Sequence, residues 1–413
     1  MLALQYRKSV PRYVWVKLVG GRFPGALTAP GGFLHLTQVP EPSLPTASWV
    51  RIRPSLSGIC GSDLGAVAGK SSIYLSAFTS FPFVPGHEVV ASVVETGPAV
   101  SSVSVGERVV LEPALGCAAR GFSDLCHPCR DGHYANCERV TQGDVSAGVQ
   151  TGYCRDTGGG WGSELVAHES QLHVVPGSVP DEAAVMTEPL SCAMHSVLEA
   201  QLPEGARVLV VGSGTIGLLT VAALEALAPT ATVVAVAKYA HQKELATALG
   251  AEHVVPPGEK GYEQLAKLSG GSSYSLPIGK PAVLGGFDAT FECTGSASGV
   301  EDAMRWTRSQ GQLVITGMPS VNKIDLTPIW YQELRVNGAY AYSMETNGTG
   351  KVKTFQLALD MLSKDGWGDR LATLVRHRFS LKQHRKAITT AMRSGRSGAV
   401  KAVFEFAPER RDE

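Results

Sequence analysis

Two short segments punctuated by glycine contain side chains that could hold a catalytic metal. Cys60 lies in the sequence Gly-Ile-Cys-Gly-Ser-Asp at residues 58–63, and His87 and Glu88 lie in Pro-Gly-His-Glu at residues 85–88. A thiolate, an imidazole and a carboxylate are zinc ligands, and catalytic zinc sites keep one position open for water or substrate. The pattern predicts such a site, although Gly-His-Glu alone also fits an ordinary loop.

A second group of potential ligands consists of four cysteines in a segment of about residues 112–140. Their spacing is C-x8-C-x2-C-x7-C, formed by Cys117, Cys126, Cys129 and Cys137. Four thiolates in one short loop suit a closed, tetrahedral structural zinc. Two disulfides are the alternative, which we disfavour because the N-terminus lacks the apolar run of a secretion signal.

A glycine-rich sequence indicates a site for a dinucleotide cofactor. The apolar run at residues 207–211 leads into Gly-x-Gly-x-x-Gly and then into a helical pattern up to Leu227. In this context the glycines permit a tight turn and a close backbone approach to a pyrophosphate at the helix N-terminus. The predicted phosphate-binding residues are Gly212, Gly214, Thr215, Ile216 and Gly217.

The end of the following strand, at residues 232–237, indicates which nicotinamide cofactor is used. NAD enzymes usually carry an acidic residue there for the ribose 2′-hydroxyl, but this chain has Ala237 and no acidic residue between Glu225 and Glu244. Basic groups would suit a 2′-phosphate, so NADP is favoured. NAD use, with the lysines merely solvated, is the alternative. The residues expected at this end of the cofactor are Lys238, Tyr239 and Lys243.

Two further apolar runs, within residues 287–295 and 311–317, predict more strands of the same parallel sheet. Ligands of such sheets bind beyond the carboxyl ends of the strands. The residues predicted to line the nicotinamide pocket are Thr294, Gly295, Gly317 and Met318. The stretch at residues 270–286 is rich in glycine, serine and proline and is predicted to be a surface loop.

Length and composition indicate the general class of the protein and its number of domains. A chain of 413 residues is long enough for two domains, and 44% hydrophobic with 18% charged residues is typical of a soluble globular protein. The zero formal net charge gives no reason to expect a nucleic-acid partner. The apolar region at residues 206–237 is interrupted by glycines, Glu225 and Pro229, which argues against a membrane span. We expect a cytoplasmic protein.

The strand and turn signals divide the chain into two domains. Residues 1–110 read as β-rich, and the tail ends in a predicted strand at residues 399–404 that could complete the first domain. The α/β cofactor domain would then be inserted into the catalytic one. The predicted boundaries are 1–189 with 339–413 for the catalytic domain and 190–338 for the cofactor domain.

Taken together, these motifs resemble the zinc-dependent alcohol dehydrogenases of the medium-chain dehydrogenase/reductase superfamily. The resemblance extends over the two ligand segments, the four-cysteine segment, Glu188-Pro189-Leu190 and the glycine fingerprint. It implies a GroES-like β-rich catalytic domain, a Rossmann cofactor domain with a doubly wound parallel sheet, one catalytic and one structural zinc, and a homodimer or homotetramer. The sugar, polyol and threonine dehydrogenase branches are the most similar.

The resemblance also implies roles for individual residues. Cys60 and His87 match the catalytic zinc ligands, and Glu188 matches a ligand position of the polyol, sugar and threonine branches. Glu88 matches a carboxylate that joins or leaves the metal. Ser62 matches the hydroxyl that hydrogen-bonds the substrate alcohol.

The resemblance also concerns the orientation of His87, the route of the proton and the spacing of the four cysteines. Asp63 matches a partner that orients His87, a role common beside metal-bound imidazoles. Gly65 stands where many relatives carry a proton-relay histidine, so the route of the proton is open. The cysteine segment has eight residues between its first two cysteines where many relatives have two.

The predicted activity is hydride transfer between a secondary alcohol, polyol or sugar and NADP, giving an aldehyde or ketone. Zinc would make the alkoxide accessible near neutral pH, while the cofactor carries the hydride. Two alternatives stay open: an NADPH-dependent carbonyl or alkene reductase, and a catalytically silent NADP-binding or sensor protein on the same fold.

Overall fold

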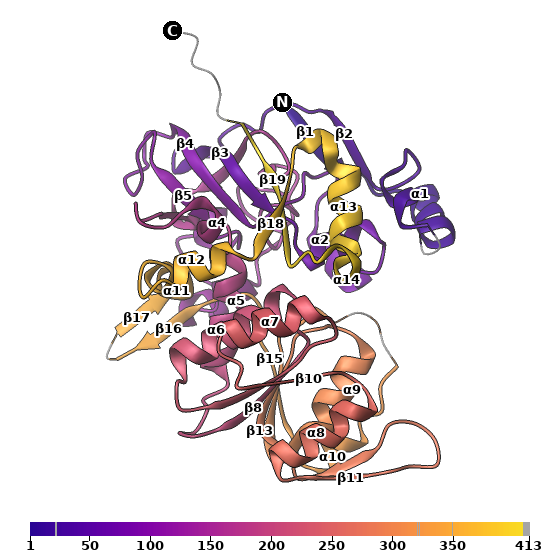
Figure 1. The fold of residues 1–413 in the computed structure, drawn as a ribbon. Coiled ribbons are helices and arrows are strands. Elements are labelled where there is room, and N and C mark those ends of the chain that lie inside the picture. The colour runs from indigo at the N-terminus through magenta and orange to yellow at the C-terminus, as the bar shows by residue number, and fades with distance from the viewer. Residues whose placement is uncertain (21–22, 320, 322, 349, 408–413) are drawn as a thin grey trace. The chain divides into compact units, whose positions relative to one another are not determined.

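The computed structural model describes residues 1–20, 23–319, 321, 323–348 and 350–407. The chain forms two compact units, shown in Figure 1. Unit 1 contains Met1–Glu188 and Thr346–Glu413, and unit 2 contains Pro189–Glu345. The chain therefore returns to unit 1 after residue 345 rather than after the predicted residue 338. The reason is that Ser343 and Glu345 contact a histidine of unit 2.

Unit 1 is built on a seven-stranded sheet in the order β18-β19-β3-β4-β5-β7, with β6 paired to β3. All its neighbouring strands are antiparallel except β18 and β19, so this unit is β-rich as predicted. The strands are β3 (Trp49–Gly58), β4 (Val89–Thr96), β5 (Arg108–Leu111), β6 (Leu165–His168), β7 (Leu172–Val174), β18 (Val375–Phe379) and β19 (Lys401–Glu405). Outside this sheet lie β1 (Leu2–Tyr6), β2 (Leu34–Gln38) and β17 (Gly350–Lys353).

The helices of unit 1 are short and lie between these strands in the sequence. They are α1 (Val10–Trp15), α2 (Gly61–Val67), α3 (His127–Asp131), α4 (Asp181–Ala184), α11 (Thr354–Leu362), α12 (Trp367–Ala372), α13 (His384–Met392) and α14 (Ser394–Ser397). The tail of the chain, drawn in yellow in Figure 1, joins the main sheet through β19, which pairs with β3. The tail therefore belongs to the same sheet and the same unit as the first part of the chain.

Unit 2 contains a parallel six-stranded sheet in the order β10-β9-β8-β13-β14-β15. With β8 as the first strand, this is the doubly wound order 3-2-1-4-5-6 of the Rossmann fold. The predicted fold class is confirmed. The strands are β8 (Arg207–Val211), β9 (Thr232–Val236), β10 (His253–Val255), β13 (Phe287–Glu292), β14 (Thr307–Ile315) and β15 (Arg335–Gly338).

Helices connect these parallel strands, as such crossovers require. They are α6 (Thr215–Leu227), α7 (Ala240–Ala248), α8 (Glu259–Ser269), α9 (Ala297–Trp306) and α10 (Thr327–Tyr331). Two elements lie at the crossings between the units, α5 (Thr187–Glu199) and β16 (Met344–Asn347). The segment 270–286, predicted as a loop, instead contains a two-stranded hairpin of β11 (Ser272–Tyr274) and β12 (Ala282–Leu284).

The apolar region 206–237 forms β8, α6 and β9 rather than one long helix. Across the described part of the chain, no helix combines the length and the apolar character needed to cross a membrane.

Candidate metal and cofactor sites

The two segments predicted to bind the catalytic zinc are brought together by neighbouring strands. Strand β3 ends at Gly58, two residues before Cys60, and β4 begins at Val89, directly after Glu88. Because the two strands are antiparallel, the end of one lies beside the start of the other. Cys60, His87 and Glu88 each offer one ligand atom, and these atoms all lie within 4.8 Å of one another.

The electrostatic surroundings of His87 favour positive charge. The ring is buried, and its Nδ1 lies 3.6 Å from Oδ1 of Asp63 without forming a hydrogen bond. Burial lowers the pKa of His87, but the Asp63 carboxylate and the Cys60 sulfur together raise it well above its usual value. The same negative groups would stabilise a bound cation.

Asp63 is itself held in place by its neighbours. Its Oδ2 accepts a hydrogen bond of 3.2 Å from the backbone N–H of Cys60, and its Oδ1 accepts one of 3.5 Å from the hydroxyl of Tyr153. Burial and the neighbouring negative groups raise the pKa of Tyr153 well above its usual value. The side chains around the candidate ligands thus form one connected polar group.

Trp161 fixes both ligand segments from the core of unit 1. Its indole N–H donates a 3.2 Å hydrogen bond to the carbonyl of Gly58, and its ring lies so close to Gly86 that an added Cβ would be 2.4 Å from Cδ1. The side chain is fully buried. Trp161 is therefore a core residue that holds the two loops in register.

Lys401 of β19 is a residue of this site that sequence reasoning missed. Its Nζ donates to both carboxylate oxygens of Glu88, each at 2.6 Å, and both side chains are almost fully buried. Burial lowers the pKa of Lys401, but Glu88, Cys60 and Glu188 together raise it above its usual value. The available signal was a lysine inside the apolar run Ala-Val-Lys-Ala-Val-Phe at residues 399–404.

This ion pair competes with the predicted role of Glu88 as a zinc ligand, because Lys401 already compensates the charge of the Glu88 carboxylate. Glu188, the other predicted carboxylate ligand, lies in the first turn of α5 and is buried. Its negative charge is close enough to raise the pKa of Lys401. Among the described residues, however, Glu188 does not join the group of Cys60, His87 and Glu88 within 4.8 Å.

The four cysteines of the predicted structural site converge in unit 1. The Sγ atom of Cys137 lies 3.7 Å from that of Cys117 and 3.8 Å from that of Cys126. All four Sγ atoms lie within 4.8 Å of one another. Zinc–sulfur bonds of about 2.3 Å place tetrahedral sulfurs about 3.8 Å apart. All eight cysteines of the chain are described and all are free, so the disulfide alternative is wrong.

The glycine-rich segment of unit 2 forms a tight turn between β8 and α6. Gly212 follows β8 with a φ of +100°, which favours glycine. A Cβ on Gly217 would lie 1.8 Å from the carbonyl oxygen of Gly212, so only glycine fits there. Gly214 caps α6 at its N-terminus, and the helix starts with Thr215 and Ile216.

The residues predicted to line the nicotinamide pocket lie beside this turn. A Cβ on Gly212 would be 2.5 Å from Cγ2 of Thr294, and one on Gly295 would be 2.2 Å from the carbonyl oxygen of Met318. The buried carboxylate of Glu292 accepts hydrogen bonds from the N–H groups of Thr294 and Gly295. The ends of β8, β13 and β14 therefore meet here.

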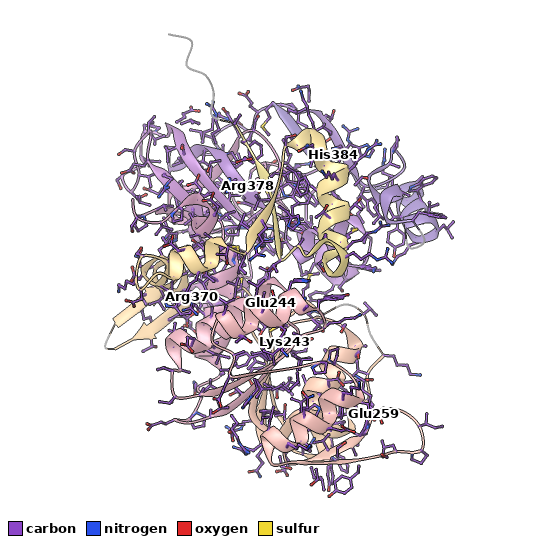
Figure 2. All side chains as sticks on the ribbon, viewed as in Figure 1. Lys243, Glu244, Glu259, Arg370, Arg378 and His384 are labelled. Atoms are coloured by element: carbon purple, nitrogen blue, oxygen red, sulfur yellow. The ribbon has the colours of Figure 1, made fainter. Side chains whose placement is uncertain are left out.

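The predicted ribose end of the cofactor site has exposed basic residues. Lys238 follows β9, and its Nζ lies 5.6 Å from the ring centroid of Tyr239. Figure 2 labels Lys243 and its acidic neighbour Glu244 on α7. Both lysines are exposed. Their ammonium groups are thus accessible to an anionic ligand.

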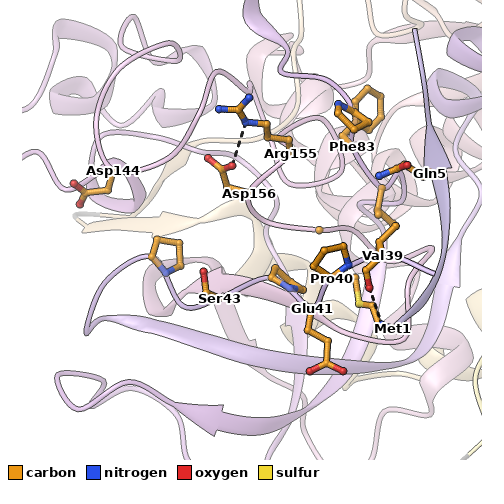
Figure 3. A pocket seen from close by; sticks show the side chains of 15 residues that line it. Met1, Gln5, Val39, Pro40, Glu41, Ser43, Phe83, Asp144, Arg155 and Asp156 are labelled. Carbon is orange, nitrogen blue, oxygen red and sulfur yellow. Dashed lines mark hydrogen bonds and ion pairs between the residues drawn. The ribbon is translucent and has the colours of Figure 1, made fainter. Parts of the chain in front are cut away.

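Unit 1 also contains a pocket of 460 Å³, shown in Figure 3. Its lining includes several prolines but no cysteine or histidine. Arg155 and Asp156, two of its charged residues, lie 3.4 Å apart in an ion pair. This pocket holds none of the candidate metal ligands, and we assign no catalytic role to it.

Comparison with known families identifies the class of protein. Residues 46–177 match the alcohol dehydrogenase GroES-like domain, and residues 215–364 match the zinc-binding dehydrogenase domain. Together these matches cover more than half of the chain. The chain belongs to the zinc-binding alcohol dehydrogenase family, and it is an oxidoreductase.

Individual relatives agree with this assignment. The chain is 30% identical over 362 residues to a sorbitol dehydrogenase of Arabidopsis thaliana, covering 86% of this chain and 88% of the relative. It is 28% identical over 364 residues, with the same coverage, to an L-idonate 5-dehydrogenase of Vitis vinifera. The structure of 2R,3R-butanediol dehydrogenase from Bacillus subtilis has a TM-score of 0.70 at 22% identity, covering 98% of this chain and 99% of that one, and supports the fold.

Proposed function

We propose that the protein transfers a hydride between a secondary alcohol, polyol or sugar and NADP, with zinc at Cys60 and His87. The convergence of Cys60, His87 and Glu88 within 4.8 Å is the observation that carries the proposal. The sorbitol and L-idonate dehydrogenase relatives favour a polyhydroxy substrate. A screen of secondary alcohols, polyols and aldose sugars with both cofactors tests the substrate class.

In this proposal each side chain has one task. A zinc ion bound here would act as a Lewis acid and lower the pKa of an alcohol oxygen. Cys60 and His87 would hold the ion, with carboxylates from Glu88 and Glu188, and Asp63 would keep the imidazole of His87 oriented. Ser62 would accept the proton of the alcohol.

Position 65 is a glycine and cannot relay the proton. As Ser62 accepts the proton of the alcohol, it would pass its own proton to the cofactor ribose or to water. Close by, the hydroxyl of Tyr153 donates a 3.5 Å hydrogen bond to Oδ1 of Asp63. The hydride chemistry belongs to the nicotinamide.

Metal analysis provides a first prediction. After dialysis against metal-free buffer, the protein should retain two zinc ions per chain, one at Cys60 and His87 and one at the four cysteines, because thiolate ligands bind zinc tightly. Inductively coupled plasma mass spectrometry measures the ratio. A ratio near one would remove one of the two sites from the proposal.

A second prediction concerns cofactor choice. Lys238→Ala should raise the KM for NADP by about 10-fold or more, because a charge-assisted hydrogen bond contributes about 1.5–3 kcal/mol. The KM for NAD should change less than about twofold, since NAD lacks the 2′-phosphate. Initial-rate kinetics with both cofactors measure this effect.

The exposed Lys260 on α8 supplies the matched control, because it lies far from β9 in the sequence and is not among the predicted cofactor residues. Lys260→Ala should leave both KM values unchanged. Equal increases for NADP and NAD in Lys238→Ala would contradict the proposed preference.

The reverse direction is the second candidate function. One relative, 28% identical over 330 residues, is named as a probable diacetyl reductase of Saccharomyces cerevisiae. The same zinc site could polarise a carbonyl for reduction by NADPH. Turnover measured in both directions on matched alcohol and ketone pairs separates the two functions.

A further inference from the structure

A third group of potential ligands lies in unit 2 and takes no part in the proposed reaction. His195 and Glu199 are one helical turn apart on α5, so their side chains share one face of that helix. Glu345 comes from β16. The Nδ1 atom of His195 lies 2.8 Å from Oε1 of Glu345.

The ligand atoms of this group lie close enough together to contact one metal ion. His195, Glu199 and Glu345 each offer one ligand atom, and the three atoms lie within 4.8 Å of one another. His195 and Glu345 are each 6% exposed, whereas Glu199 is partly exposed and gives an ion access from solvent. The hydroxyl of Ser343 donates a 3.0 Å hydrogen bond to Oε1 of Glu345 and so orients that carboxylate.

We propose that His195, Glu199 and Glu345 bind a divalent cation that accepts nitrogen and oxygen ligands, such as Mn²⁺. Two carboxylates this close repel each other, and the repulsion is stronger where water is excluded. A protonated imidazole offsets one negative charge, while a divalent cation offsets both. The ion would link α5, where the chain enters unit 2, to β16, where the chain leaves that unit.

The ligand types separate this site from the two cysteine sites. Carboxylate oxygens suit Mn²⁺, and thiolates select zinc. A protein whose cysteine sites already hold zinc should therefore bind added Mn²⁺ at the third group. The inference goes beyond the proposed dehydrogenase function and does not depend on it.

The test uses the full chain, dialysed to two zinc ions per chain so that the third group is empty, and titrated with MnCl₂ alone; unbound Mn²⁺ is measured by electron paramagnetic resonance. We expect one Mn²⁺ bound per chain. Glu199→Gln should weaken this binding at least tenfold, because it replaces a charged ligand by a neutral one on a partly exposed side chain. Glu204→Gln, at an exposed position five residues on, is the matched control and should bind Mn²⁺ like the wild type.

Circular dichroism and the zinc content of each variant establish that the fold and the cysteine sites are intact. Equal Mn²⁺ binding by the wild type and Glu199→Gln would overturn the proposal, as would the absence of bound Mn²⁺ in the wild type. Neither result involves turnover or the zinc count, so failure here is distinguishable from failure of the proposed function.

Discussion

Replacing Cys60 with serine is expected to lower kcat/KM by at least about a thousandfold while the protein stays folded. The zinc ion supplies several kcal/mol of charge stabilisation in such reactions, and each 1.36 kcal/mol is about a tenfold change in rate. Serine is similar in size but is not a thiolate ligand. Steady-state kinetics and the zinc content of the purified variant should show both losses, with one zinc left per chain.

Cys154→Ala is the control for the loss of a thiol in unit 1. Cys154 is buried, and its Sγ lies 3.4 Å from the carbonyl oxygen of Ser146 rather than near another candidate ligand. This variant should keep two zinc ions and most of its activity. Full activity in Cys60→Ser with one zinc missing would show that catalysis does not use this site.

Replacing Lys401 with methionine is expected to destabilise the folded protein by about 3–5 kcal/mol, because it leaves the charge of Glu88 buried and uncompensated. Both side chains are almost fully buried and both carboxylate oxygens accept from the lysine, so solvent does not screen the pair. Urea unfolding of the metal-free protein, in which no ion compensates Glu88, is followed by circular dichroism and measures the free energy of unfolding.

The double variant Lys401→Met with Glu88→Gln should recover much of the lost stability, because the buried charge is then gone. Lys364→Met, at an exposed position, should change the free energy of unfolding by less than about 0.5 kcal/mol. A double variant no more stable than Lys401→Met would show that the loss comes from packing and not from charge.

The parts of the site that depend on local sequence were predictable. The turn at Gly212 is specified by the strand before it and the helix after it, and the segments at Cys60 and His87 border the strands β3 and β4. The four cysteines were recognisable because they lie close together in the sequence. In each case the residues that must meet are neighbours or adjoin elements with a clear pattern.

The parts that depend on distant pairing were not predictable. Lys401 and Glu88 are 313 residues apart, and no local pattern shows that β19 pairs with β3. The contact of His195 with Glu345 spans 150 residues, which is why the return to unit 1 was placed too early. The hairpin of β11 and β12 was not predicted because its strands have only three residues each, too few to show an alternating pattern, and prolines and a glycine lie between them.

The pairing of β19 with β3 has a consequence for the order of events during protein synthesis. A ribosome that has made Cys60, His87 and Glu88 must still translate all of unit 2 before it adds Lys401. Domains generally fold as units while the chain emerges, so the dinucleotide-binding half is complete first. The buried glutamate gains its counter-ion only when the last strand docks, and maturation of the neighbouring centre is therefore a late, post-translational step.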